Sequence, residues 1–334
     1  MSSDGVSGGE EAIIQEFLAP LARDFPGAFG LKDDCALLTP EPGTELVLKT
    51  DPVRAGIHFF PDDPPADIAW KALAMNVSDL VAKGARPLAY LAALSFSETP
   101  RREWMAQFAR GLGEAQAAFG CHLIGGDTDK APGPLSIAIT AIGVVPRGRM
   151  VRRGTARAGD VLFVSGTIGD SAMGLYARSN GFARRFWPLD EAERAWLEQR
   201  YRRPQPRLAL TSALIEHASA AMDVSDGLVK DLDRMARASG VGARVEMMRV
   251  PLSVAGAKVA ASVPEWRLRA MTGGDDYEVL AAVPATRADG FKADAAAAGV
   301  VVTAIGQFEG DAGVRVLGPD GAPVAVDRTG WDHF

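Results

Sequence analysis

The sequence has 334 residues, of which 47% are apolar, and its formal net charge is -6. A chain of this length corresponds to about two domains of ~150 residues, each large enough to bury a core. The excess of acidic residues argues against broad electrostatic binding to nucleic acid or to an anionic membrane. Two cysteines and four histidines are too few to suggest a disulfide scaffold, a thiolate zinc site or a histidine-based metal centre.

The hydropathy of the chain gives no sign of membrane insertion or export. No apolar run approaches the ~18 residues that a membrane span needs. The N-terminal segment MSSDGVSGGEE is small and acidic, whereas a signal peptide begins basic and continues apolar. We therefore expect a soluble, unprocessed cytoplasmic protein in which Cys35 and Cys121 are small buried residues.

The first half of the chain alternates helical and strand patterns. Apolar periodicity predicts helices over 12–22, 66–85 and 103–119, and strands over 45–49, 88–96 and 135–145. The turn residues of GGDTDKAPGP predict a loop before the last of these strands. Asp51 then lies at the end of a strand, and Asn76, Asp79 and Lys83 form a polar stripe on one helix face.

The second half repeats this alternation. Strands are predicted over 160–165, 221–224, 243–247 and 277–283, and a helix over 228–239. The segment GTIGDS after the first of these strands lacks the lysine of a phosphate-binding loop, so we interpret it as a plain strand-to-helix turn. The basic, aromatic stretch 181–205 is interpreted as a surface helix pair. Together the halves predict two α/β domains that meet near residue 150.

Two segments of the first half have echoes in the second. AMNVSD resembles AMDVSD, and IGGDTD resembles TGGDDY, at offsets of 147 residues from Asn76 to Asp223 and 148 residues from Gly125 to Gly273. A diverged duplication and a chance match of acidic turns are both compatible with this pattern.

Aspartates recur in or beside predicted turns and on one helix face. The six sites are Asp33-Asp34, Asp51, Asp79, Asp127 with Asp129, Asp223 with Asp226, and Asp275-Asp276. A single such aspartate is usually a helix N-cap, but six together favour a hard divalent cation such as Mg²⁺, which prefers oxygen ligands. Glycine pairs precede Asp127 and Asp275 and would let the backbone approach a phosphate. Because the chain has neither a GxxxxGK[ST] motif nor protein-kinase motifs, a nucleoside triphosphate site would need another scaffold.

Several segments, in this order, resemble the thiamine-monophosphate kinase family, which shares a superfamily with aminoimidazole ribonucleotide synthetase and selenophosphate synthetase. They are GLKDDCALL, KTDPVRAGIHF, KALAMNVSDLVAKGARP, LIGGDTD, RRGTARAGD with VSGTIGDS, MDVSDGLVKDL, TGGDDYEV and GWDHF. The resemblance implies an α/β (α+β) fold with mixed sheets flanked by helices. It further implies an ATP- and metal-binding, dimerising domain over 1–148, a second domain over 149–334 that completes the active site in their cleft, and a homodimer.

The same resemblance implies ATP-dependent conversion of thiamine monophosphate to thiamine diphosphate by direct in-line transfer, assisted by several Mg²⁺ ions. The acceptor phosphate is largely ionised at neutral pH, so no general base is needed. Carried over position by position, the implied magnesium ligands are Asp34, Thr50, Asp51, Asp79, Asp127, Asp223 and Asp226, supported by Asp33 and Asn76. The implied ATP contacts are Gly126, Asp127, Arg153 and Ser225. The implied substrate contacts are His58, Asp275 and Trp331, the last by stacking on the cationic thiazolium.

Four positions depart from the family pattern: Lys32, Lys49, Asp129 and Asp275. Lys49 replaces a serine or threonine, which removes one potential metal ligand, and Asp275 is one methylene shorter than the family glutamate. Another enzyme of the same superfamily and a non-catalytic protein that binds divalent cations are the alternatives. Consumption of ATP in the presence of thiamine monophosphate separates these possibilities.

Overall fold

The computed structural model describes residues 5–331, apart from the side chains of Phe182 and Arg184. The fold consists of two compact units, Met1–Leu80 with Ala85–Gly148, and Val81–Gly84 with Arg149–Phe334. No helix within residues 5–331 is long and apolar enough to cross a membrane.

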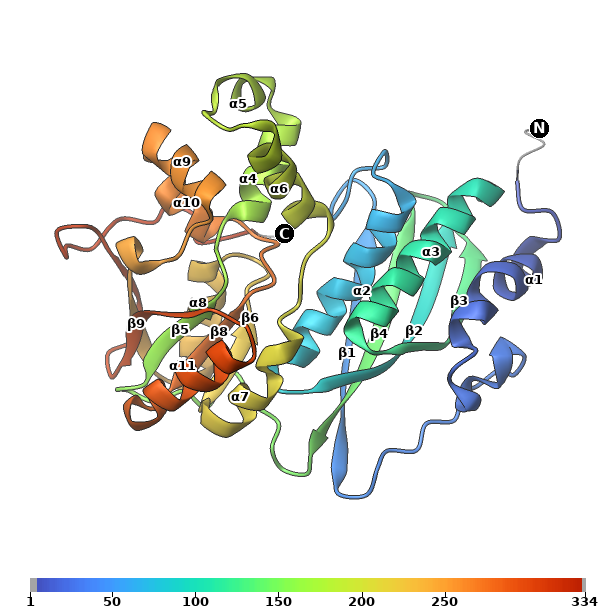
Figure 1. The fold of residues 1–334 in the computed structure, drawn as a ribbon, viewed down its shortest axis with the longest axis horizontal. Helices are drawn as coiled ribbons and strands as arrows, with labels where there is room; N and C mark the ends of the chain where they lie inside the picture. The colour runs from blue at the N-terminus through green and yellow to red at the C-terminus, as the bar shows by residue number, and fades with distance from the viewer. Residues whose placement is uncertain (1–4, 332–334) are drawn as a thin grey trace. The chain divides into compact units, whose positions relative to one another are not determined.

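The first unit is built on a four-stranded sheet. In spatial order its strands are β1 (Thr44–Arg54), β4 (Ser136–Pro146), β2 (Arg86–Phe96) and β3 (His122–Lys130). β4 is antiparallel to both of its neighbours, whereas β2 and β3 are parallel. Helices α2 (Pro65–Ala82) and α3 (Arg102–Phe119) cover one face of this sheet (Figure 1). Most of α2 is buried, and its Asn76 and Asp79 contact residues of β1.

The N-terminal helix is shorter and less regular than the sequence predicts. The expected helix over 12–22 is divided into α1 (Gly9–Ile13), a π-helical turn (Ile14–Leu18) and a 3₁₀ turn (Ala19–Ala22). Pro20 explains the change, because proline has no N–H to donate to the carbonyl one turn earlier. A further 3₁₀ segment, Pro26–Leu31, also packs against β3.

One strand of the first unit extends beyond its predicted end, and another was not predicted at all. β1 continues through Asp51 to Arg54, so Asp51 lies inside a strand and the predicted strand end is wrong. Pro52 is tolerated there because β1 is an edge strand, where a missing N–H breaks no ladder. The predicted loop GGDTDK is also wrong, because it forms most of β3 and pairs in parallel with β2.

The second unit contains a six-stranded mixed sheet. Its spatial order is β10 (Gly313–Leu317), β7 (Gly242–Glu246), β9 (Val302–Glu309), β5 (Val161–Ser165), β8 (Val279–Val283) and β6 (Ala220–Asp223). Only β10 and β7 are parallel among the described pairs. The helices are α4 (Asp170–Ser179), α5 (Gly181–Phe186), α6 (Glu191–Arg202), α7 (Thr211–His217), α8 (Leu228–Ser239), α9 (Val254–Ser262), α10 (Trp266–Thr272) and α11 (Ala288–Ala297). Short 3₁₀ turns occur at Leu208–Leu210, Met247–Arg249 and Ala285–Arg287.

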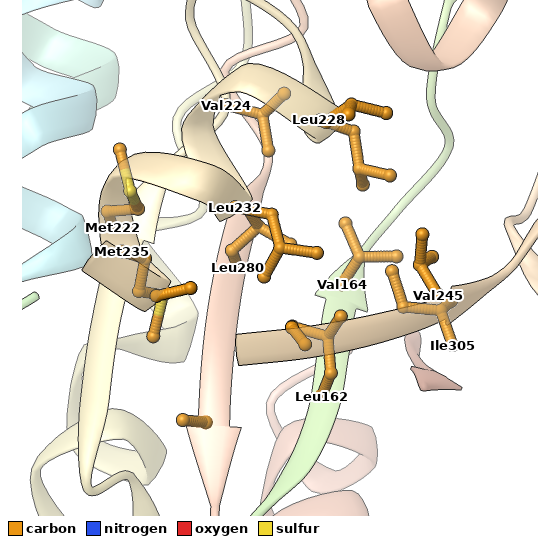
Figure 2. Packing of buried hydrophobic residues seen from close by; sticks show 14 of the residues in the cluster. Leu162, Val164, Met222, Val224, Leu228, Leu232, Met235, Val245, Leu280 and Ile305 are labelled. Atoms are coloured by element: carbon orange, nitrogen blue, oxygen red, sulfur yellow. The ribbon is translucent and has the colours of Figure 1, made fainter. Parts of the chain in front are cut away.

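Helix α8 packs its apolar face on this sheet. Leu228, Leu232 and Met235 recur at helical spacing and meet strand residues such as Val164 and Leu280 (Figure 2). Phe163, on the opposite face of β5, meets the ring of Phe291 in α11 at 5.2 Å. The sheet is therefore covered on both faces. The packing of α8 on the sheet also determines the position of the short loop between β6 and α8.

The second unit differs from the sequence-based predictions at residues 181–205 and at the proposed repeat. Residues 181–205 do form a helix pair, α5 and α6, but Leu197, Arg200 and Tyr201 of α6 are buried, so the surface assignment is wrong for this face. The proposed repeat segments differ in local structure, because AMNVSD lies in α2 whereas AMDVSD spans the end of β6 and a turn. Their likeness therefore reflects no shared supersecondary unit.

Candidate functional site

In the first unit, the polar stripe of α2 faces the edge strand β1. Side chains alternate along a strand, so Lys49 and Asp51 project from the same face of β1. The buried Asn76 accepts a hydrogen bond from the Asp51 N–H at 2.9 Å and donates to the Ala72 carbonyl at 3.1 Å. Asn76 thereby holds the backbone of Asp51 against α2. Asp79 follows Asn76 by one turn of the same helix.

Lys49 lies between the two carboxylates of this face. Its Nζ is 2.9 Å from Asp51 Oδ2 and 2.8 Å from Asp79 Oδ2. Burial lowers the pKa of Lys49, but the carboxylates of Asp79 and Asp51 outweigh burial and raise the pKa above its ordinary value. The side chain is therefore an ammonium at neutral pH, and a single positive charge already neutralises part of this acidic pair.

The remaining predicted ligands of the first unit are more dispersed. The Thr50 side chain lies on the other face of β1 and its Oγ1 is 3.0 Å from Thr140 Oγ1. Asp127 is exposed in β3, where its Oδ1 accepts the Thr128 N–H at 2.9 Å. Asp34 lies in the exposed loop after the Pro26–Leu31 turn.

Beside Asp34, Asp33 Oδ1 accepts the N–H of Cys35 at 3.3 Å. Cys35 is exposed, so its expected burial is wrong, because its loop lies outside the sheet and the helices. Cys121 is buried as expected.

Gly126 has a packing role that is independent of any ligand. Its φ is 154°, and a Cβ at this position would come within 1.8 Å of the Ala92 carbonyl oxygen on β2. The close approach of β2 and β3 therefore requires glycine. This requirement accounts for one of the two glycine pairs without a phosphate.

His58 lies in the turn that follows β1. Its Nδ1 accepts the Arg54 N–H at 3.0 Å, while its own N–H donates to the Arg54 carbonyl at 2.9 Å. In the neutral ring the proton is consequently on Nε2, which becomes the hydrogen-bond donor of this side chain.

In the second unit, the chain after β6 forms a tight loop around a buried carboxylate. Asp223 ends the strand and is 4% exposed. Asp231 in α8 is fully buried, and its Oδ2 accepts the N–H groups of Ser225, Asp226 and Gly227 at 2.9, 2.8 and 3.2 Å. These three amides therefore donate within the protein and not to a ligand.

Two distant segments are attached to the same loop by backbone hydrogen bonds. The Asp275 N–H donates to the Ser225 carbonyl at 2.8 Å, and the Trp331 N–H donates to the Asp226 carbonyl at 2.9 Å. Gly274 is required here, because a Cβ would come within 2.6 Å of the Ser225 oxygen. The structure thus brings together four residues that the sequence singled out for ATP, metal or substrate: Ser225, Asp226, Asp275 and Trp331.

Arginine side chains contact both the carboxylates and the aromatic ring at this loop. Arg234 NH1 lies 2.6 Å from Asp226 Oδ2 and 3.0 Å from Asp231 Oδ1. Burial raises the pKa of Asp231 to about 6, and the negative charge of Asp226 adds to this effect. Trp331 is 47% exposed, with the Arg328 guanidinium 5.7 Å from its ring centroid. Asp332–Phe334 of the predicted GWDHF motif lie outside the described residues.

A buried ionic network supports the Asp275 segment, and sequence reasoning missed most of it. Glu278 is fully buried and pairs with Arg200 at 3.0 Å and with Arg207. Burial raises the pKa of Asp276 well above its ordinary value, although its two oxygens accept the Gly169 N–H at 2.9 and 3.0 Å. The Gly169 amide of the GTIGDS turn is therefore bound by the protein's own carboxyl group, in line with a plain strand-to-helix turn.

Arg153 lies apart from these contacts within the second unit. It is exposed in the connector before β5, and its carbonyl accepts the Ser239 hydroxyl at 3.2 Å, at the end of α8. Lys83, the last residue of the predicted stripe, lies beyond the end of α2 and donates to the Ala221 carbonyl at 2.9 Å.

The donor sets suit magnesium in chemistry but only partly in geometry. Carboxylate oxygens are the ligands that a hard divalent ion prefers. Within residues 5–331, however, no three His, Cys, Asp or Glu side chains converge as a metal site. Asp127 and Asp223 remain suitable oxygen donors, and Asp226 would share its carboxylate with Arg234. The Lys49 ammonium lies between the carboxylates of Asp51 and Asp79, where a metal ion that bridges them would lie, so this pair does not fit a metal ion.

Comparisons with known proteins cover both units. Residues 32–145 match the family described as AIR synthase related protein, N-terminal domain, and residues 157–318 match the corresponding C-terminal domain. A thiamine-monophosphate kinase of Caulobacter vibrioides is 41% identical over 96% of this chain and 89% of the relative. One from Escherichia coli K12 is 40% identical over 91% of each chain.

Solved structures agree with these relatives. Thiamine-monophosphate kinase from Stenotrophomonas maltophilia K279a is 38% identical with a TM-score of 0.79, and covers 88% of this chain and 91% of its own. AaThiL, solved in complex with AMPPCP and TMP, is 32% identical with a TM-score of 0.76 over 89% of each chain. The predicted two-domain fold and the family resemblance are therefore confirmed. The chain belongs to the thiamine-monophosphate kinase family.

Proposed function

We propose that the chain transfers the γ-phosphoryl group of ATP to thiamine monophosphate and so produces thiamine diphosphate and ADP. The observation that carries this proposal is similarity along both units to enzymes that bear this activity as their name. The relative solved with AMPPCP and TMP adds the two substrate classes. The clustering of Ser225, Asp226, Asp275 and Trp331 supports the same conclusion from geometry.

The reaction joins two anions, so charge and alignment decide its rate. The acceptor phosphate is largely ionised at neutral pH, because its second pKa is about 6, and it needs no general base. Divalent ions, when bound, cancel charge on the phosphates and hold them in line. We propose Asp34, Asp127, Asp223 and Asp226 as side-chain ligands, and the Thr50 backbone as a further donor, because the Thr50 side chain faces the other side of β1 from Asp51.

The remaining roles are proposed from the hydrogen bonds that the local geometry already fixes. Ser225 meets ATP through its hydroxyl, since its N–H already donates to Asp231. Gly126 and Arg153 are proposed as further ATP contacts on the family pattern. His58 donates from Nε2 to the acceptor phosphate, because Nδ1 already accepts the Arg54 N–H.

For thiamine itself we propose contacts at the exposed ring of Trp331 and at Asp275. Trp331 offers a face on which a cationic thiazolium can stack. Asp275 has a φ of 68° and its Oδ1 accepts the Tyr277 hydroxyl at 3.0 Å, which fixes the carboxylate beside the Ser225–Asp226 loop.

We also propose a homodimer formed through the sheet of the first unit. Leu46 and Leu48 project from the outer face of β1 and are 36% and 64% exposed. Exposed leucines side by side on an edge strand favour a partner that buries them. A cytoplasmic location is proposed because the reaction consumes ATP. Equilibrium sedimentation tests the dimer, with Leu48→Lys expected to yield monomers.

The activity is tested with a panel of acceptors. Protein, Mg²⁺ and ATP are incubated in separate reactions with thiamine monophosphate, with thiamine, or with the precursor of aminoimidazole ribonucleotide, and the ADP released is measured. Thiamine monophosphate alone is expected to support ADP release; another acceptor in its place would refute the assignment. Asp226→Asn should lose most turnover while remaining folded, because Asp226 lies at the centre of the clustered loop.

The control for this variant is Asp233→Asn in the same helix region. Asp233 pairs with Arg237 at 2.8 Å on the exposed side of α8. Its replacement removes one carboxylate and one ion pair without touching the loop, so turnover should stay near the wild-type rate. Equal loss in both variants would contradict the role of Asp226.

A further inference from the structure

The acidic face of β1 and α2 contains a cation supplied by the chain itself. Lys49 Nζ makes two contacts of hydrogen-bond length, 2.9 Å to Asp51 Oδ2 and 2.8 Å to Asp79 Oδ2. The Lys49 side chain is 29% exposed, so the pair is partly screened from water. Contacts between charged groups at this distance and depth are stronger than those of an open surface pair.

The positions of all three groups are determined by the backbone around them. Lys49 and Asp51 share one face of β1, which pairs with β4 along its whole length. The Asn76 side chain ties the Asp51 N–H to α2 at 2.9 Å, and Asp79 follows one turn later on the same helix. The backbone therefore places the carboxylates of Asp51 and Asp79 within reach of the Lys49 ammonium.

We propose that the Lys49 ammonium takes the place of a divalent cation between Asp51 and Asp79, so that this carboxylate pair does not bind Mg²⁺ in this protein. Mg²⁺ would need the same oxygens at about 2.0–2.1 Å, and it would then lie close to a fixed positive charge. Mg²⁺ and the ammonium would together bring three positive charges to two carboxylates. The site would then have a net charge of +1, and the two cations would repel each other.

This inference deepens the proposed function, since it concerns the metal requirement of the same enzyme. It predicts that the protein holds about one divalent ion fewer than a variant with a small neutral residue at position 49. The ammonium also remains in place when Mg²⁺ is removed, so this part of the site needs no added metal to stay ordered.

The test counts bound Mn²⁺ by electron paramagnetic resonance, without nucleotide or thiamine monophosphate. Lys49→Ser is expected to bind about one Mn²⁺ more per chain than the wild type, and the double variant with Asp79→Asn should return to the wild-type number. Lys49→Arg keeps the charge and should also keep the wild-type number. Equal Mn²⁺ counts for folded Lys49→Ser and the wild type would overturn the inference.

Two further variants test whether loss of any ion pair changes the Mn²⁺ count and whether Asp79 binds an ion in the wild-type protein. Lys258→Ser removes the 2.6 Å pair with Glu193 elsewhere in the chain, and it should leave the Mn²⁺ count unchanged. Asp79→Asn in the otherwise wild-type protein should lose no bound Mn²⁺, whereas loss of one ion would overturn the inference. Because these counts involve no turnover, failure of the phosphoryl-transfer assay would refute the proposed function and leave this result standing.

Discussion

Replacing Asp231 by alanine should unfold the loop that carries Ser225 and Asp226. One oxygen of Asp231 accepts three backbone N–H groups at 2.8 to 3.2 Å, and the residue is fully buried. Leaving a buried donor without a partner costs ~1–3 kcal/mol, and because only the Gly227 donor is fully buried, the three donors together cost at most ~6 kcal/mol. Removing the carboxylate also relieves the cost of its buried charge.

That relief follows from the pKa of Asp231. Burial raises the pKa of Asp231 from 3.8 to about 6, so the anion costs on the order of 3 kcal/mol at neutral pH. The net effect of alanine is therefore a loss of up to about 3 kcal/mol in the free energy of unfolding. Turnover should fall with it, because the loop no longer holds its side chains in place.

Asparagine provides the matched comparison. Its carbonyl oxygen can still accept the three N–H groups and it has no charge, but its amide faces Arg234 and loses the 3.0 Å contact. Asp231→Asn should therefore lie within ~1 kcal/mol of the wild type. Urea unfolding at pH 7, followed by circular dichroism, measures both variants. Equal stability of the alanine and asparagine variants would refute this reasoning.

Three further predictions concern other parts of the chain. Gly126→Ala should disrupt the pairing of β3 with β2 and lower the melting temperature by several degrees, because its Cβ would meet the Ala92 oxygen; an unchanged melting temperature would contradict this packing. Burial raises the pKa of Cys121 to about 12, so a thiol reagent at pH 8 should label only Cys35 in the native chain, and rapid labelling of both thiols would exclude this burial. Asp276 has a raised pKa when folded, so its contribution to stability is full below pH 3.8 and is lost as pH rises through the folded value. Asp276→Asn should flatten this decline in urea unfolding across pH, and equal slopes would count against it.

Elements with a strong local pattern could be predicted from the sequence. Helix α8 has the predicted bounds, because Leu228, Leu232 and Met235 repeat at helical spacing and Gly240 ends the helix in a left-handed conformation. The acidic segments around Asp226 and Asp275 were also singled out correctly as neighbours of turns. Both signals come from residues close together in the chain.

Features that depend on a distant partner could not be predicted. β3 has the composition of a turn, and only its parallel pairing with β2 makes GGDTDK a strand. The charge of Lys49 shows its significance only once α2 places Asp79 beside it. Arg200 was taken as a surface residue because nothing in its own helix indicates that Glu278 lies buried next to it.

The buried role of Asp231 belongs to the same class. The sequence shows an acidic residue inside a helix, which commonly faces solvent, whereas the structure turns its carboxylate onto three amides of the preceding loop.

Phosphorus nuclear magnetic resonance of a single reaction mixture tests the central claim most directly. With enzyme, Mg²⁺, ATP and thiamine monophosphate, the signal of the monophosphate should give way to the two coupled phosphorus signals of thiamine diphosphate, while ATP becomes ADP in equal amount. Conversion of ATP to ADP and inorganic phosphate with the monophosphate signal unchanged would contradict the account.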